Sequence, residues 1–288
     1  MNEITRKLIV TADDLGLSTE INQGIIDAFQ SGIVTSASLL VNAPETESAV
    51  DLARENPGLE IGLHWSLVEG HCLLRRECSL TDTRRYLGNP VCLHRHWKPF
   101  MTRYFLGQIR MRELAEELEL QAQRFLTFFP DIPFANGTQH LHLLPGIRDL
   151  IINLSKKYGI RALRVPHKII PTPEIKARAL FSRMMSKLGH DFFFDLGGSA
   201  IRTTDSFAGF DMSGAIHADR IFSLLDALPE GSCELMTHPG MDCPALRKQL
   251  PWAYDEFDWN REREALISSR IMNKIDSLGI SLIRFKDL

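Results

Sequence analysis

At four places in this chain, a short apolar segment leads to side chains that bind metals or transfer protons. These residues are Asp13 and Asp14, His64, His140 and His142, and His238. Aspartate and histidine together are ligands for zinc, and for a harder ion such as Mg²⁺ when further oxygens contribute. Such an ion binds water and polarises a carbonyl group, while a carboxylate can act as base and a histidine as acid for a leaving amine. The residue types therefore favour hydrolysis of an amide or an ester.

Each of these residues also has a structural explanation when it is taken alone. An Asp-Asp pair after a strand can belong to a turn or a helix cap, and His64 can be a hydrogen-bonded core residue. His140 and His142 can serve a loop, and His238 can belong to a turn. These explanations do not predict that all the residues follow short strands. Two adjacent carboxylates at a buried strand end would also repel each other, which a cation would relieve. The coincidence favours one shared site.

Parallel strands with crossover helices are expected to position these side chains. Residues 8–12 are apolar without alternation, which is typical of a buried parallel strand, and Asp13 and Asp14 follow them. Further strands are expected at 34–41, 59–63, 133–136, 160–165 (with Arg161 and Arg164 on one face), 233–236 and 280–285. Helices are expected at 18–32, 44–56, 112–129, 145–158, 171–188, 215–228 and from Asp258 or Asn260 to 278. Because carboxyl ends of parallel strands meet at one face, the candidate residues would converge there.

Residues from about 70 to 111 interrupt the alternation and form a predicted insertion. The segment is rich in arginine, lysine and histidine, and it carries Trp97, Phe100, Tyr104 and Phe105. It is too long and irregular for an ordinary strand-to-helix connection. Two explanations stay open: a solvated loop with a local aromatic cluster, or a cover over the site that handles an anionic or sugar-like ligand. A dimer contact or a lipid-side surface is open as well.

The composition restricts the partners and the location. The chain has 288 residues, 44% of them hydrophobic, and a formal net charge of −3. This is enough apolar material for one large core, so residues 1–288 are expected to form a single domain, and the charge gives no support for a nucleic-acid partner. The five cysteines lack a regular spacing, which favours a reducing cytoplasm over a disulfide framework. No apolar run reaches the roughly 18 residues of a membrane span.

Motifs along nearly the whole chain resemble those of the YdjC-like carbohydrate deacetylases. They read TADDLGLS at 11–18, GIVTSASL at 32–39, IGLH at 61–64, QHLHLLPG at 139–146 and ELMTHPG at 234–240. LVEG at 67–70 and RVP at 164–166 are most similar to the hopanoid-biosynthesis-associated branch; the chito-oligosaccharide deacetylases are the other well-known branch. The resemblance implies a single irregular (β/α) barrel related to the polysaccharide deacetylases. It also implies a hydrolase that removes an acetyl group from an N-acetylated sugar or sugar-lipid with a divalent metal ion, Mg or Zn.

The resemblance assigns roles to individual residues. Asp14 and His64 would be metal ligands, and Asp13 would be the general base that activates water. His238 would be the general acid or an oxyanion partner. Arg164 is expected to orient the sugar or a carboxylate.

The expected third metal ligand is missing from this chain. The family segment normally reads Asp or Asn, a small residue, and then three histidines at alternate positions, whereas residues 136–142 read NGTQHLH, with Thr138 at the first histidine. Three outcomes are open. His140 can replace the missing imidazole as the third ligand, water can fill the position, or the chain has lost metal-dependent activity. His142 is expected at the substrate.

These outcomes define two functions. The first is a metal-dependent carbohydrate N-deacetylase, and the alternative is a catalytically weakened member that binds a glycan or glycolipid. Hydrolysis of a glycosidic bond is a weaker third reading, because adjacent carboxylates are poorly placed to flank a bond from two sides. The exact substrate, the metal and a homodimeric state stay open.

Overall fold

The computed structural model describes residues 5–82, 91–171, 179–241, 244, 248, 253 and 256–288. Its central strand is β1 (Arg6–Leu15), which pairs in parallel with β7 (Gly231–Thr237) along one edge. On the other edge, β2 (Ser36–Leu39) pairs with the C-terminal part of β1, and β8 (Ser281–Leu282) pairs with its N-terminal part. The apolar residues that predict β1 are fully buried, as expected for a strand with neighbours on both edges.

The remaining strands extend this sheet on both sides. They are β3 (Glu60–Trp65), β4 (Phe134–Gly137), β5 (Ala162–Leu163) and β6 (Ser206–Ala208). The order is β5-β4-β3-β2-β1-β7-β6, and all of its pairings are parallel. The carboxyl ends of these strands therefore lie at the same end of the sheet, as the sequence predicts.

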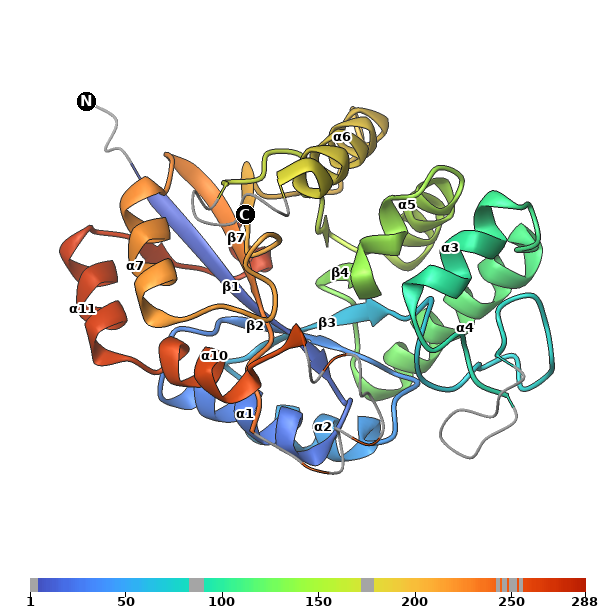
Figure 1. The fold of residues 1–288 in the computed structure, drawn as a ribbon, viewed down its shortest axis with the longest axis horizontal. Coiled ribbons are helices and arrows are strands. Elements are labelled where there is room, and N and C mark those ends of the chain that lie inside the picture. Colours follow the sequence, from blue (N-terminus) through green and yellow to red (C-terminus); the bar gives the residue numbers. More distant parts are fainter. Residues whose placement is uncertain are drawn as a thin grey trace.

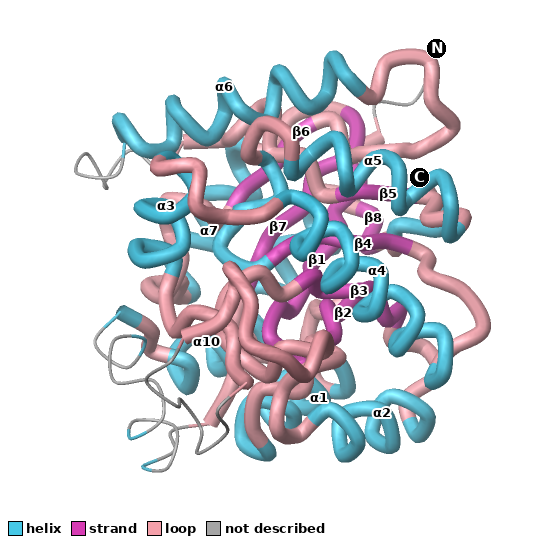
Figure 2. The backbone as a smooth tube through the Cα atoms, turned by 90° about the vertical axis from the view of Figure 1, so that its right-hand side faces the viewer, coloured by secondary structure: helices cyan, strands magenta, loops and turns pink. Residues whose placement is uncertain are grey.

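The two outer strands approach each other, so the sheet is curled. Parallel bridges join Ala162 to Arg202 and Ile169 to Phe207, and therefore connect the chain near β5 with the chain near β6. The helices lie around the outside of the strands (Figures 1 and 2). The predicted α/β class is confirmed, and the irregular (β/α) barrel of the prediction takes the form of a curled parallel sheet.

Crossover helices follow the strands in the predicted order. They are α1 (Thr19–Gln30), α2 (Thr46–Glu55), α4 (Met111–Phe128), α5 (Ile147–Tyr158), α6 (Ala179–Asp195) and α7 (Ala218–Ala227). Ser18 caps α1 as expected, because its side chain accepts a hydrogen bond from the Ile21 amide. The predicted helix at 171–188 falls in part on residues 172–178, outside the described residues, and α6 continues it to Asp195. No helix within the described ranges is long and apolar enough to cross a membrane.

The C-terminal region differs from the sequence prediction. Instead of one helix, it contains α10 (Trp259–Leu266) and α11 (Ser269–Ser277). The helix breaks because the Leu266 carbonyl accepts a hydrogen bond from the Ile33 amide (3.2 Å) and Ser268 adopts an extended backbone. The predicted strand at 280–285 is reduced to β8, and the 3₁₀ helix η4 (Phe285–Asp287) follows it.

The segment expected as an insertion contains α3 (Trp97–Phe105) among its described residues. Its base is held by a hydrogen bond from the Glu69 amide to the His94 carbonyl (2.7 Å). At the far end of α3, the Tyr104 hydroxyl donates to the Pro145 carbonyl (2.6 Å). The described part of the segment is therefore attached to the chain around β3 and α5.

Candidate active site

A backbone irregularity brings both predicted carboxylates into one pocket. Successive residues of a regular strand point to opposite faces, so Asp13 and Asp14 would normally diverge. In β1, the pairing register with β2 shifts between Ala12 and Leu15, and Asp14 has a left-handed backbone with φ of 68°. Both side chains line the pocket as a result. The sequence places the pair after the strand; the structure places it within β1, at the bulge.

Asp13 is almost completely buried and is held by an arginine. Its Oδ2 lies 2.5 Å from Arg164 Nη1, its Oδ1 lies 2.9 Å from Arg164 Nη2, and Ser38 Oγ donates to Oδ1 at 2.9 Å. Burial opposes ionisation of this carboxyl, but the Arg164 charge and hydrogen bonds outweigh burial and hold the pKa of Asp13 well below its usual range. Asp13 is therefore an anion at any pH near neutrality.

Arg164 lies behind the pocket and not in its lining. Its side chain is fully buried, and Nη2 also pairs with Glu234 Oε1 at 2.7 Å. Arg161, which the sequence predicts on the same face, is exposed and pairs with Asp131 instead. The prediction of a shared face is wrong because residues three apart on extended chain point in opposite directions.

Asp14 and His64 face each other across the pocket wall. Asp14 Oδ1 lies 3.5 Å from His64 Nε2, and the Asp14 side chain is a quarter exposed. The Asn136 carboxamide contacts His64 Nδ1 at 2.5 Å and Ser38 Oγ at 2.7 Å, so it connects this pair with the Asp13 cluster. Burial opposes protonation of His64, but the nearby Asp13 and Asp14 carboxylates outweigh it and raise the pKa of the ring.

Thr138 occupies the position of the expected third ligand. It lines the pocket, and its hydroxyl accepts a hydrogen bond from the Leu67 amide at 3.3 Å. His140 also lines the pocket, with its ring against Phe207 and Phe210 and its buried Nδ1 without a partner. Burial lowers the pKa of His140 well below the ordinary value, so the ring is neutral. Among the residues that the structure describes, no three His, Cys, Asp or Glu side chains form a group that could hold a metal ion.

His142 lies apart from the other candidates. It is fully buried, does not line the pocket, and its Nε2 lies 3.1 Å from the Arg164 carbonyl oxygen. Burial lowers its pKa to about 3, so it is a neutral ring that supports the chain carrying Arg164.

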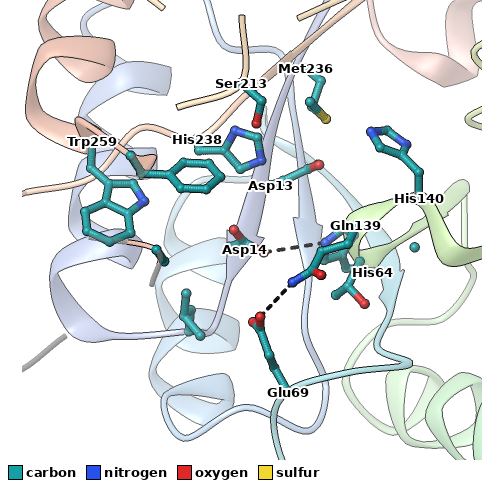
Figure 3. Close-up of a pocket in the computed structure, with 15 residues that line it drawn as sticks. Asp13, Asp14, His64, Glu69, Gln139, His140, Ser213, Met236, His238 and Trp259 are labelled. Atoms are coloured by element: carbon teal, nitrogen blue, oxygen red, sulfur yellow. Dashed lines mark hydrogen bonds and ion pairs between the residues drawn. The ribbon is translucent and has the colours of Figure 1, made fainter. Parts of the chain in front are cut away.

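His238 follows β7 as predicted and lines the pocket together with Asp13 and Asp14. In Figure 3, His238 and Trp259 lie on one side of the pocket and His140 lies on the other. The His238 ring contacts Phe257 edge to face, with 4.8 Å between ring centroids. Burial lowers the pKa of His238, so its ring is neutral at neutral pH.

Glu69 is a pocket residue that the sequence reasoning did not single out. Its carboxyl group accepts a hydrogen bond from Gln139 Nε2 at 2.8 Å (Figure 3). The side-chain Oε1 of Gln139 accepts one from the backbone amide of Trp97 (3.1 Å), at the start of α3. Burial and the Asp14 charge raise the pKa of Glu69 well above the ordinary value. The LVEG motif at 67–70, which contains Glu69, is the sequence signal that could have indicated it.

The backbone around this pocket is strained. Five non-glycine residues of the described chain have a left-handed backbone, and four of them line the pocket: Asp14, Glu69, Gln139 and His140. Such conformations cost free energy and gather at functional sites. The pocket at the carboxyl end of the sheet is therefore the candidate active site.

The sequence matches the family model described as "YdjC-like protein" over residues 7–277, which is most of the chain. The chain belongs to the YdjC-like family. The resemblance seen in the motifs is thereby confirmed. As a YdjC-like protein, the chain is 33% identical over its whole length to a carbohydrate deacetylase of Homo sapiens, of which it covers 93%. It is 28% identical to a chitooligosaccharide deacetylase of Enterobacter sp. (strain 638), with 98% of each chain covered.

The fold of this YdjC-like chain also has a counterpart among solved structures. A protein of Enterococcus faecalis V583, described by a role in cellobiose-phosphate cleavage, superimposes with a TM-score of 0.74. The sequence identity is 23%, and the alignment covers 98% of each chain. This similarity supports the fold alone.

Proposed function

We propose that this chain is a carbohydrate N-deacetylase, which hydrolyses the acetamido group of an N-acetylated sugar to acetate and a free amine. The observation that carries the proposal is the position of Asp13 and His238, which line one pocket in a chain whose full-length relatives are named carbohydrate deacetylases. A carboxylate and an imidazole in one pocket are the base and acid that amide hydrolysis needs.

Asp13 is suited to hold and deprotonate the attacking water. An ionised carboxylate has about four acceptor positions. Ser38 and Arg164 donate hydrogen bonds to Asp13, and Asn136 Nδ2 lies 3.3 Å from the same Oδ1. Because Asp13 lines the pocket, we propose that a water molecule there displaces or shares the weakest of these contacts. The low pKa makes Asp13 a weak base but keeps it ionised, and Arg164 fixes its orientation. We propose that this is the role of Arg164: it positions Asp13 and does not touch the sugar.

His238 has two candidate roles. A neutral ring carries one N–H, which can donate to the oxyanion that forms from the acetyl carbonyl, or it can protonate the leaving amine. The aromatic rings of Phe257 and Trp259 beside it offer an apolar wall for a sugar, and Glu69 and Gln139 offer polar groups. A pocket of this mixed kind is typical of a site for a small polar ligand.

The residues present do not complete the family's expected metal site. Asp14 and His64 supply one carboxylate and one imidazole, but Thr138 offers only a neutral hydroxyl that already accepts a hydrogen bond from the Leu67 amide. A hydroxyl is a poor substitute for imidazole at a zinc-type ion. The metal-activated water and His140 as third ligand stay predictions.

We expect that Thr138→His raises the affinity for Zn²⁺ at least about 10–100-fold, since even a residue outside the first shell changes metal affinity by that factor. The measurement is metal content after dialysis against a Zn²⁺ buffer, with Thr127→His on the surface of α4 as the control. An unchanged metal content in Thr138→His would argue that another residue already completes the site.

Acetate release tests the proposed function. The purified chain is incubated with N-acetylglucosamine and N-acetylated chito-oligosaccharides, with each of several divalent metal ions, and acetate is measured. We expect acetate from at least one of these sugars. The absence of acetate with every ion and sugar in the panel would contradict the proposal.

Thr138 favours a second candidate function, a glycan-binding protein without catalysis. The same sugars distinguish the two functions when their binding is measured by calorimetry. Binding of a sugar without any release of acetate would support the second candidate.

A further inference from the structure

A second buried carboxyl lies directly behind His238. Glu262, in the middle of α10, is 1% exposed, and its Oε1 accepts a hydrogen bond from the His238 backbone amide at 2.5 Å. The same oxygen lies 3.9 Å from His238 Nδ1. Both His238 Nδ1 and Glu262 Oε2 are buried without a hydrogen-bond partner. Buried polar atoms without a hydrogen-bond partner are costly, and two of them on neighbouring side chains need an explanation.

The hydrogen bond from the His238 backbone amide does not explain why residue 262 carries a carboxyl group. A glutamine of the same shape would accept that bond without placing an ionisable group in the core, where an unpaired charge is expensive. What a carboxyl adds at this position is a proton that can be given up and taken back. Its neighbour across 3.9 Å is a ring nitrogen, and such contacts between catalytic groups are often long before substrate binds.

The proposed reaction creates a need for that proton. The leaving amine must be protonated, and a neutral His238 ring can give up its single N–H only if its other nitrogen gains a proton. Burial lowers the pKa of His238, whereas burial raises that of Glu262 to about 8. At neutral pH the proton of this pair therefore lies on Glu262. The other charged or titratable groups that face the pair are Asp13, Asp14, His64, Arg164 and Asp258.

We propose that Glu262 is a positioning residue that supplies His238 with the proton for the leaving amine; this rests on the deacetylase function proposed above. As the C–N bond breaks, the amine nitrogen takes the proton of His238 Nε2, and Nδ1 takes the proton of the Glu262 carboxyl. Glu262 becomes a carboxylate and His238 becomes the other neutral tautomer. Asp13 holds the proton taken from water. Asp13 then releases its proton and Glu262 takes one up, so both groups return to their starting protonation states.

The variant Glu262→Gln tests this role, because it keeps the shape and the acceptor for the His238 amide but removes the proton. Glu264→Gln, on the exposed side of the same helix, is the matched control. Two substrates are compared. An N-acetylated chito-oligosaccharide has an amine leaving group that needs a proton, whereas 4-nitrophenyl acetate has a phenolate leaving group that needs none.

For Glu262→Gln we expect kcat on the sugar to fall about 100-fold, in the range of general acid catalysis, while kcat on the aryl acetate changes no more than a few-fold. A parallel loss on both substrates would indicate a structural role and overturn the inference, as would no loss on either. If the wild-type chain releases acetate from neither substrate, the proposed function fails, and the inference fails with it.

A measurement on the wild-type chain keeps the test valid if Glu262→Gln does not fold. Since Glu262 must carry a proton, sugar deacetylation should fall as pH rises through about 8, the pKa of this carboxyl. Hydrolysis of the aryl acetate, corrected for the spontaneous rate, should not fall over the same range. An identical alkaline loss on both substrates would contradict the role of Glu262.

Discussion

Replacement of Asp13 by asparagine is expected to lower kcat for acetate release by about 10²–10⁴-fold, the usual contribution of a general base. The substitution removes the proton acceptor but keeps the size of the side chain and an oxygen that can accept from Ser38 and Arg164. Arg164 also keeps its ion pair with Glu234, so it is not left without a counter-charge. The loss should therefore be one of catalysis and not of folding.

Steady-state kinetics on the sugar and thermal unfolding check this prediction together. The control is Asp131→Asn, which changes an exposed carboxylate that pairs with the exposed Arg161. If Asp13→Asn retains activity within a few-fold of wild type, Asp13 is not the base. The kinetic comparison applies when the thermal unfolding of Asp13→Asn stays close to that of wild type.

Replacement of Arg164 by alanine is expected to destabilise the chain by about 3–5 kcal/mol, because it leaves buried charge without its partner. Two buried carboxylates, Asp13 and Glu234, share this one guanidinium. Arg161→Ala is the matched control, since Arg161 lies three residues earlier and forms an exposed pair worth less than about 1 kcal/mol. The measurement is the free energy of unfolding from urea titration, and equal values for the two variants would contradict the buried cluster.

The penalty for Arg164→Ala should depend on pH in a defined direction. In the wild-type chain, the folded-state pKa of Asp13 is lowered, so its contribution to stability is present above the unfolded value of about 4 and is lost as pH falls through the folded value. Without Arg164, the buried Asp13 carboxyl would take up a proton more readily. The stability difference between the variant and wild type should therefore shrink as the pH is lowered below about 5.

The elements of the fold could be predicted from hydrophobic pattern, because burial dictates it directly. The apolar residues 8–12, 59–63 and 233–236 predict β1, β3 and β7, and these strands carry the candidate carboxylates and histidines to one end of the sheet. The break between α10 and α11 could not be predicted in this way. It depends on a hydrogen bond between Leu266 and Ile33, which are far apart in the sequence.

The candidate site was predictable only in part, for a similar reason. Asp13, Asp14, His64 and His238 follow apolar segments, so strand ends indicate them, and all four line the pocket. The roles that burial imposes depend on partners distant in sequence, as with Glu262 behind His238. The same holds for Arg164, because its position in the sequence does not indicate that its side chain points inward to Asp13 and Glu234.

The joint yield of acetate and free amine from an N-acetylated chito-oligosaccharide tests the deacetylase proposal most directly. The proposal predicts that the wild-type chain releases the two products in equal amounts and that Asp13→Asn releases about 10²–10⁴-fold less of both. Sugar binding by the wild-type chain with no acetate or amine above the level of Asp13→Asn would contradict it, and would leave the pocket as a binding site for glycans.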